Sequence, residues 1–195
     1  MSMTAREVFS PQRIQRECSR LLLVDLQEKL LGVMSERERV VQRCRWLAEA
    51  AGWFGIPVTL TEQYPQGLGP TVEPLRELGI QPLVKRCFSA IEVLNWPAPC
   101  AEEVSRYQVV LAGVEAHVCV LQTALDLSSL GYSVAVVSDA VTSRFPLDAQ
   151  RAGERLRDQG IMLVTAEMVL FEWCATADDP HFKALSRLVK ARQQA

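Results

Sequence analysis

Three residues of this chain have side chains suited to nucleophilic catalysis: Asp25, Lys85 and Cys119. Each follows a short run of apolar residues, which is typical of a buried strand. A thiol that attacks a carbonyl carbon must become a thiolate. A nearby ammonium stabilises that thiolate, and a carboxylate can produce it by accepting the proton. If the fold brings the three residues together, they form the centre of a cysteine-dependent reaction.

Cys119 stands where a strand pattern changes to a helix pattern. Residues 109–112 form an apolar run with β-branched residues, and after Gly113 the apolar residues recur at helical spacing up to Leu130. We therefore expect a buried strand and then a helix over 117–130, with Cys119 in its first turn. Unpaired backbone N–H groups and the helix dipole stabilise a thiolate there. The alternative is a small buried apolar residue, as most free cysteines are.

Asp25 and Lys85 end two further predicted strands, at 20–25 and 82–85. In an open α/β sheet, the ligand crevice lies outside the carboxyl ends of the strands. Both side chains are therefore predicted at the edge of the sheet where Cys119 also lies. The alternatives are a capping or turn aspartate at position 25 and a solvated surface lysine at position 85.

The strands that carry these residues alternate with helices along the chain. This alternation predicts a three-layer α/β/α, Rossmann-like domain with a central, mostly parallel six-stranded sheet. Ser35 and Glu38 form a capping-box pattern at the start of a long helix. Residues 1–19 are predicted to be an N-terminal arm and residues 20–195 a single domain. The predicted strands are 20–25, 56–61, 82–85, 109–112, 132–138 and 161–165, and the predicted helices are 35–54, 72–78, 117–130, 146–159, 166–174 and 179–192, with a helical turn at 101–105.

Composition and charge exclude several classes of partner. The chain has 195 residues, of which 49% are hydrophobic and 23% charged, and its net charge is −2. These values are typical of a globular domain and give no basic surface for a nucleic acid. No apolar run reaches the length that crosses a membrane. Six cysteines without a CxxC pair, and an N-terminus without a signal-peptide pattern, predict free thiols in a reducing cytoplasm.

Four segments, taken in order, resemble the isochorismatase-like cysteine hydrolases, and the resemblance extends over nearly all of 20–190. A fifth segment, Thr-Glu-Gln-Tyr-Pro-Gln-Gly-Leu-Gly-Pro at 61–70, is most similar to the subgroup called isochorismatase domain-containing proteins. The four segments are Leu-Leu-Val-Asp-Leu-Gln at 22–27, Val-Lys-Arg-Cys-Phe-Ser-Ala at 84–90, Leu-Ala-Gly-Val-Glu-Ala-His-Val-Cys-Val at 111–120 and Val-Ser-Asp-Ala-Val-Thr-Ser-Arg at 137–144.

The resemblance implies a catalytic triad in which Cys119 is the nucleophile, Asp25 the base and Lys85 the cation. It also implies a cis peptide bond between Val114 and Glu115. In that arrangement the N–H groups of Glu115 and Cys119 point at the developing oxyanion. The reaction implied is hydrolysis through a thioester on Cys119.

The sequence departs from the nicotinamidase branch of this family after the second strand. That branch carries an Asp-x-His pair and a later His that bind a metal, whereas Glu62, Gln63 and Tyr64 occupy this region here. The only histidines are His117 and His181, so we predict no metal and no cofactor. Isochorismatases proper act on a vinyl ether without a cysteine nucleophile. The resemblance therefore favours hydrolysis of a small amide-like C–N bond.

Loop positions at the carboxyl edge of the sheet predict the walls of a pocket for a small-molecule substrate. His117 also fits a surface residue at a helix start. Apolar helices and the family resemblance predict a homo-oligomer. Two alternatives stay open, namely a catalytically weak oligomeric scaffold and a redox-active thiol protein in which Cys119 reacts with Cys87. The expected pocket residues are Leu26, Gln27, Tyr64, Phe88, His117 and Arg144.

Overall fold

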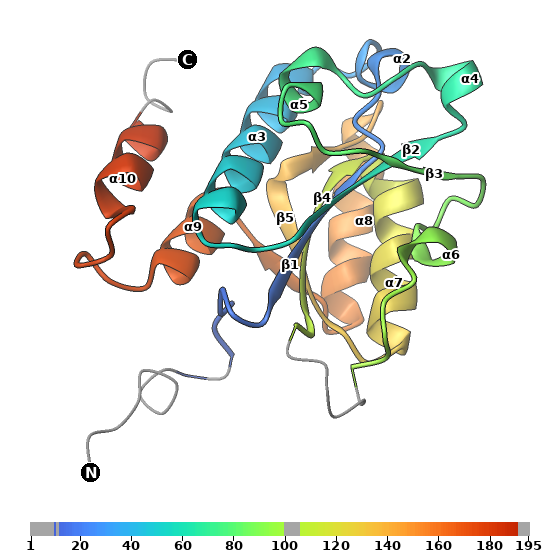
Figure 1. The fold of residues 1–195 in the computed structure, drawn as a ribbon. Helices are drawn as coiled ribbons and strands as arrows, with labels where there is room; N and C mark the ends of the chain where they lie inside the picture. The colour runs from blue at the N-terminus through green and yellow to red at the C-terminus, as the bar shows by residue number, and fades with distance from the viewer. Residues whose placement is uncertain (1–9, 11, 100–105, 191–195) are drawn as a thin grey trace.

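Six parallel strands form one sheet at the centre of the protein (Figure 1). A computed structural model describes residues 10, 12–99 and 106–190. All five pairings between neighbouring strands are parallel. The predicted α/β class with its six-stranded parallel sheet is therefore confirmed. The strands are β1 (Ser19–Val24), β2 (Val58–Gln63), β3 (Leu83–Lys85), β4 (Gln108–Val114), β5 (Ser133–Thr142) and β6 (Met162–Val164), in the spatial order β3-β2-β1-β4-β5-β6.

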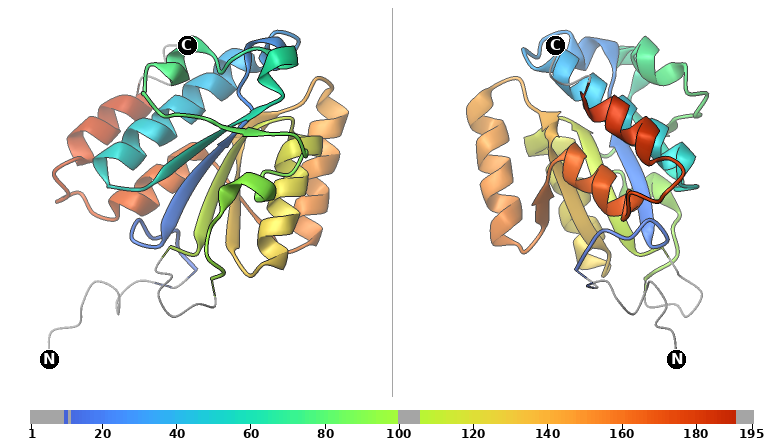
Figure 2. Two further views of the ribbon diagram at one scale, coloured as in Figure 1. Left: turned by 45° about the vertical axis from the view of Figure 1, so that its right-hand side comes forward. Right: turned by 90° about the vertical axis from the view of Figure 1, so that its left-hand side faces the viewer.

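Helices cover both faces of the sheet (Figure 2). On one face lie α3 (Arg37–Trp53) and α9 (Ala166–Cys174), and on the other lie α7 (Leu121–Ser129) and α8 (Pro146–Asp158). The chain also contains α10 (Phe182–Lys190), which packs on α9. The result is three layers with a hydrophobic core on each side of the sheet. Four short helices complete the described structure: α2 (Glu28–Leu31), α4 (Pro65–Leu68), α5 (Glu73–Arg76) and α6 (Ile91–Leu94).

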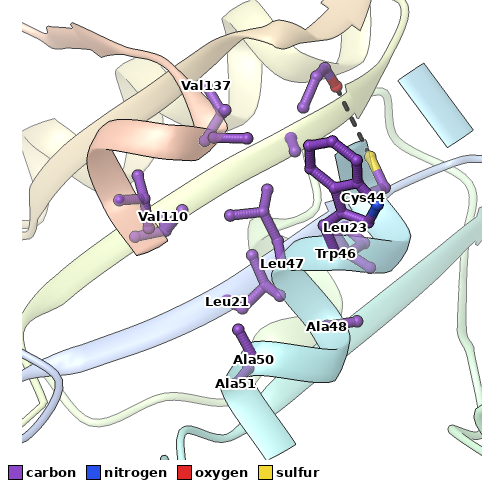
Figure 3. Close-up of a cluster of buried hydrophobic side chains, with 14 of the residues drawn as sticks. Leu21, Leu23, Cys44, Trp46, Leu47, Ala48, Ala50, Ala51, Val110 and Val137 are labelled. Atoms are coloured by element: carbon purple, nitrogen blue, oxygen red, sulfur yellow. Dashed lines mark hydrogen bonds between the residues drawn. The ribbon is translucent and has the colours of Figure 1, made fainter. Parts of the chain in front are cut away.

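The alternation of side chains along β1 supplies both cores. Leu21 and Leu23 belong to the core beneath α3, whereas Leu22 and Val24 belong to the core beneath α7 and α8. Figure 3 shows the first of these cores, in which Leu47 of α3 lies against the β1 leucines. Each such side chain removed from water contributes about 1.5–3 kcal/mol to folding. The continuous apolar run before Asp25 is therefore explained by burial on both faces.

Several element boundaries differ from the predictions. The strand β2 begins at Val58 and continues to Gln63 instead of ending at Thr61. The predicted capping box is wrong, because α3 begins at Arg37 after Glu36 and has no side-chain cap. The strand β5 continues to Thr142, with a shift of register in its pairing with β4. The helical turn predicted at 101–105 falls outside the described residues.

The described end of the predicted N-terminal arm packs against the domain. Ile14 is buried in the core beneath α3, which also contains Trp173 of α9. The Ile14 backbone N–H donates to the Glu172 carboxylate at 2.5 Å. Ser19, the last residue of the predicted arm, is the first residue of β1. In the part of the chain that the structure describes, no helix is both long and apolar enough to span a membrane.

The chain changes direction across the sheet between β1 and β4. From β1 it proceeds outward through β2 to β3, and from β4 it proceeds outward the other way through β5 to β6. Such a switch point opens a crevice at the carboxyl ends of the two central strands. Gly113 lets them approach closely, because a Cβ on this residue, at φ 123°, would overlap backbone atoms of Val24. The ends of β1 and β4, and the residues that follow them, therefore lie side by side.

Candidate active site

Asp25 and Lys85 form a buried ion pair at the carboxyl edge of the sheet. Asp25 follows the last residue of β1, and Lys85 is the last residue of β3. The Lys85 Nζ lies 2.7 Å from the Asp25 Oδ2, and both side chains have no solvent exposure. Opposite charges withdrawn from water in this way need further polar partners to remain stable. The two strands are not neighbours, so the pair reaches across β2.

The strand between them, β2, supplies those further partners. The Thr61 hydroxyl donates to the Asp25 Oδ1 at 2.8 Å, and the Gln63 side-chain oxygen accepts from the Lys85 Nζ at 2.7 Å. Thr61 and Gln63 are two residues apart, so they project from the same face of the strand. Neither residue follows from the sequence pattern, which ends this strand at Thr61 and places Gln63 in a loop. If the strand is extended by two residues, its alternating side chains place Thr61 and Gln63 on one face, and this is the signal that identifies them.

The Lys85 ammonium is also anchored by backbone oxygens. It donates to the Phe88 carbonyl at 2.9 Å and to the Cys87 carbonyl at 3.3 Å. With Asp25 and Gln63, this gives four oxygen atoms around a group that has three N–H donors. The ammonium is therefore fixed in position by its surroundings.

Cys119 lies next to this ion pair in a turn of π-helix, η1 (Ala116–Val120), between β4 and α7. A π-helical turn has i→i+5 hydrogen bonds and is frequent at functional sites. The helix predicted here therefore begins with a π turn in place of an α turn. The thiol lies near enough to Asp25 and Lys85 for both groups to act on its pKa. The three residues singled out in the sequence thus meet at one point of the structure.

The thiol form of Cys119 is favoured over the thiolate. Burial raises its pKa to about 12, and the nearby Asp25 carboxylate acts in the same direction, while the Lys85 ammonium lowers the pKa. Our prediction of a stabilised thiolate is therefore wrong for the free protein. A helix start and a cation lower the pKa of a thiol, but here their effect is smaller than that of lost hydration and of the nearby carboxylate, which raise it.

The turn before η1 is held by a carboxylate. The peptide bond between Val114 and Glu115 is cis. The buried Glu115 carboxylate accepts hydrogen bonds at 3.1 Å from both the backbone N–H and the Nε of Arg144. Its backbone oxygen accepts from the N–H groups of Val118 and Val120 at 3.1 and 3.2 Å. Arg144, which was expected at the substrate, is thus engaged with the turn that precedes Cys119.

The other expected pocket residues divide into buried and exposed groups. Leu26 and Gln27 have no exposed surface. The Gln27 side chain donates to the carbonyls of Gln63 and Gly69 and accepts from the Gln63 N–H, so it supports the frame of the site. Tyr64 and Phe88 are exposed, at 43% and 54%. These two aromatic side chains are open to a ligand, whereas the first two are not.

His117 connects η1 with the chain that follows β5. Its Nδ1 lies 2.9 Å from the Ser143 Oγ, and its Nε2 lies 3.8 Å from an Asp148 carboxylate oxygen. His117 is therefore partly buried and held from the side of α8. Among the described residues, no group of three or more His, Cys, Asp or Glu side chains is placed to hold a metal ion.

Comparisons with known proteins bear on the family. The protein-family model named isochorismatase domain matches residues 19–168 of this chain. The chain belongs to the isochorismatase family. This family member is 44% identical to isochorismatase domain-containing protein 2 of Bos taurus over 178 residues, which are 91% of this chain and 86% of the bovine protein. The resemblance stated from the sequence motifs is therefore confirmed, including its subgroup.

Two solved structures extend the comparison for this isochorismatase-family protein. One is the structure of MAR1 ribonuclease from Caenorhabditis elegans; it is 36% identical, with a TM-score of 0.81, and the match covers 91% of this chain and 92% of that one. The other is YcaC from Pseudomonas aeruginosa with hexane-2,5-diol and covalent acrylamide; it is 25% identical, with a TM-score of 0.77, and the match covers 95% and 98%. The isochorismatase-like hydrolase fold thus extends over nearly the whole chain.

Proposed function

We propose that this isochorismatase-family protein is a cysteine hydrolase that cleaves a small amide-like C–N bond with Asp25, Lys85 and Cys119. The observation that carries the proposal is the proximity of the thiol to a buried carboxylate–ammonium pair, whose own separation is 2.7 Å and whose two charges both act on the thiol pKa. A buried ion pair contributes little to stability by itself. Its presence beside a thiol at the carboxyl edge of the sheet has a reason in catalysis.

In the proposed reaction, proton transfer accompanies nucleophilic attack. Because the pKa of Cys119 is raised to about 12, thiolate is scarce near neutral pH before substrate binds. The Asp25 carboxylate takes the thiol proton while Sγ bonds to the carbonyl carbon, and the N–H groups of Glu115 and Cys119 hold the oxyanion. Asp25 then returns the proton to the leaving nitrogen as the C–N bond breaks, which leaves a thioester.

Hydrolysis of the thioester completes the cycle. Asp25, ionised again, accepts a proton from a water molecule that attacks the thioester carbonyl. The C–S bond breaks, protonated Asp25 donates its proton to the leaving thiolate, and a carboxylic acid leaves. Lys85 remains protonated throughout and offsets the negative charge that passes between Asp25 and the sulfur. No cofactor takes part in this scheme.

We expect the substrate to bind at the exposed residues near Lys85. The Phe88 side chain is exposed while its carbonyl holds the ammonium, and Tyr64 lies beneath the Arg86 guanidinium, 4.4 Å from ring centroid to Cζ. Exposed aromatic side chains are common in sites that bind small molecules. The YcaC structure holds covalent acrylamide, which is itself a small amide. Both observations support a small amide as the substrate class.

The test is turnover of a panel of small amides by the wild type and by Cys119→Ala. We expect the variant to lose nearly all activity, because no other group can form the thioester. Cys87→Ser is the matched control, since this exposed thiol lies two residues from Lys85. Undiminished turnover by Cys119→Ala would reject the mechanism.

The redox alternative is the weaker one on electrostatic grounds. The pKa of Cys87 is raised by a hydrogen bond with Glu92, and the pKa of Cys119 is raised by burial. Oxidation of a cysteine follows its thiolate content, so neither residue is primed for it.

Homo-oligomerisation stays a prediction, and the exposed side chains of Phe145 and Leu147 beside the site are the surface on which we expect it.

A further inference from the structure

A cavity of about 380 Å³ lies behind the catalytic turn, on the side away from the ion pair. Ala116 and Val120 of η1 form part of its wall, while Cys119 between them does not. The remaining walls come from the start of α3, the end of β5 and one side of α8. The volume is within the range of cavities that bind small molecules. This cavity is therefore separate from the proposed catalytic site but shares a structural element with it.

The cavity has an apolar floor and a polar mouth. Val120, Val136 and Leu156 are almost fully buried and form the floor. Ser35, Glu36 and Arg39 are more exposed and form the mouth, and the hydroxyl-bearing residues Thr142 and Ser143 also line the cavity. A ligand that fits this lining has an apolar tail and a head that accepts hydrogen bonds.

Small residues of α8 leave the space open. Ala149, Ala152 and Gly153 line the cavity where α8 passes β5 and β6. A Cβ added at Gly153 would meet only the Leu163 Cδ1, at 3.8 Å, which is an ordinary contact. The glycine is therefore not required for close packing of the helix on the sheet. Protein interiors are normally filled to the density of organic crystals, so an unfilled space of this size calls for an occupant.

Arg39 sets the charge that the head of the ligand meets. Its Nε lies 2.8 Å from a Glu36 carboxylate oxygen, and its Nη1 donates to the Asp139 carbonyl. These contacts hold the guanidinium across the mouth, offset the charge of Glu36 and do not use Nη2. A guanidinium edge in the same cavity as serine and threonine hydroxyls is suited to a carboxylate.

We propose that this cavity is a second binding site, for a small monocarboxylate with a short apolar tail. The tail lies on Val120, Val136 and Leu156, and the carboxylate accepts from Arg39 and the neighbouring hydroxyls. The ligand also reaches Ser143, whose hydroxyl is 2.9 Å from His117 on η1. The site is independent of the proposed hydrolysis, although a hydrolysed amide releases an acid of this class.

The experiment measures binding in a protein that has no nucleophile. Isotope-labelled Cys119→Ala is titrated with hexanoate, and its amide signals are followed by NMR. Hexanol, which lacks the carboxylate, and acetate, which lacks the tail, are the comparison ligands. We expect saturable shifts centred on residues of η1, β5 and α8 with hexanoate, and at least ten-fold weaker binding of the other two.

Further substitutions in the Cys119→Ala protein, at Gly153 and Arg39, test the position of the ligand. Gly153→Leu fills the cavity and is expected to abolish binding, while Gly153→Ala is the matched control that keeps it. Arg39→Gln is expected to weaken hexanoate at least ten-fold and to leave hexanol unchanged. If Gly153→Leu does not fold, Ala149→Leu serves the same purpose. Shifts centred on Lys85 and Phe88, hexanoate binding unaffected by Gly153→Leu and Arg39→Gln, or no saturable shift at all would overturn the proposal, and none of these outcomes bears on hydrolysis.

Discussion

Two groups of opposite charge act on the Cys119 thiol, so their removal should move its pKa in opposite directions. Asp25 raises that pKa and Lys85 lowers it. We expect Asp25→Asn to lower the pKa of Cys119 and Lys85→Met to raise it. Asparagine tolerates the left-handed backbone of residue 25, at φ 53°, so the first variant keeps the local fold. The measurement is the rate of iodoacetamide labelling of the Cys119 peptide against pH.

The control for this titration is Cys87, measured in the same samples. Its pKa depends chiefly on Glu92, so Asp25→Asn should leave its labelling profile unchanged. If both variants leave the Cys119 profile where it is in the wild type, the thiol is not electrostatically coupled to the ion pair. The proposed role of Asp25 as base would then lose its support.

Buried thiols should also make the fold less stable in alkaline solution. Burial raises the pKa of both Cys44 and Cys119. The unfolded chain releases these protons near the ordinary thiol pKa of about 8.5, whereas the folded chain retains them. Because the native state then binds more protons, the free energy of unfolding falls as pH rises from about 8.5 toward about 12. Below this range neither thiol makes the free energy of unfolding depend on pH.

Urea unfolding of the wild type and Cys44→Ala at pH 7.5 and pH 9.5 measures this effect. Cys44 lies in α3, away from the candidate site, with its thiol 3.7 Å from the Ala140 carbonyl (Figure 3). The variant is less stable at both values of pH because it leaves a cavity. Its loss of stability between them should nevertheless be smaller than that of the wild type. An equal or larger loss would contradict the assignment.

Gln63 should be necessary for the ion pair, although it takes no part in the reaction. Gln63→Leu removes an acceptor of the Lys85 ammonium and a donor to the Arg86 carbonyl. We expect a loss of about 1–3 kcal/mol in stability, because buried polar partners are left unsatisfied. Gln63→Glu keeps an oxygen for Lys85 and should retain more activity. Thermal unfolding and amide turnover of the two variants compare these effects.

The three residues of the proposed triad could be selected from the sequence, whereas their supports could not. A carboxylate, an amine and a thiol that come after runs of apolar residues stand out by chemical type, although the β3 residues before Lys85 are exposed. Thr61 and Gln63 have side chains that are common at surfaces, and only their positions on β2 give them partners at Asp25 and Lys85. The raised pKa of Cys119 depends on burial in three dimensions, which spacing along a chain does not measure.

At the level of single elements, hydrophobic spacing predicted which segments form helices but not how each one begins. The apolar residues from Val118 onward fit a helix, and a single π turn changes their directions too little for a pattern to detect. The difference lies in hydrogen bonding, as the Glu115 carbonyl accepts from Val120 across five residues. Ser35 and Glu38 similarly matched a capping box. However, α3 begins at Arg37, so its N-cap residue is Glu36 and not Ser35.

Gly113 should be the least replaceable residue of β4. A Cβ there overlaps backbone atoms of Val24, and its φ of 123° is unfavourable for any other residue. We expect Gly113→Ala to lower stability by about 2 kcal/mol or more, since backbone atoms cannot move aside as a flexible side chain can. Gly52→Ala in α3, where an added Cβ meets nothing within 4 Å, should raise stability by up to about 1 kcal/mol. Chemical denaturation of both variants provides the comparison, and equal stabilities would contradict it.

For the whole molecule, the sequence predicted the succession of strands but not their order across the sheet. Alternating strands and helices are compatible with several parallel orders, because each crossover can place the next strand on either side. The order found here sets β1 beside β4, with paired residues from Ser19 and Gln108 up to Val24 and Gly113. That pairing explains why residues 25 and 119 lie together although 94 positions separate them.

The same order divides the site between two parts of the chain. Asp25 and Lys85 belong to the part of the chain that forms β1, β2 and β3. Cys119 belongs to the part that forms β4, β5 and β6. Two polypeptides made separately, one ending after α6 and the other beginning before β4, would each lack part of the triad. Amide turnover would then appear only on mixing and would increase with the concentration of either piece. The protein could in this way serve as a split reporter whose signal measures the association of two halves of one sheet.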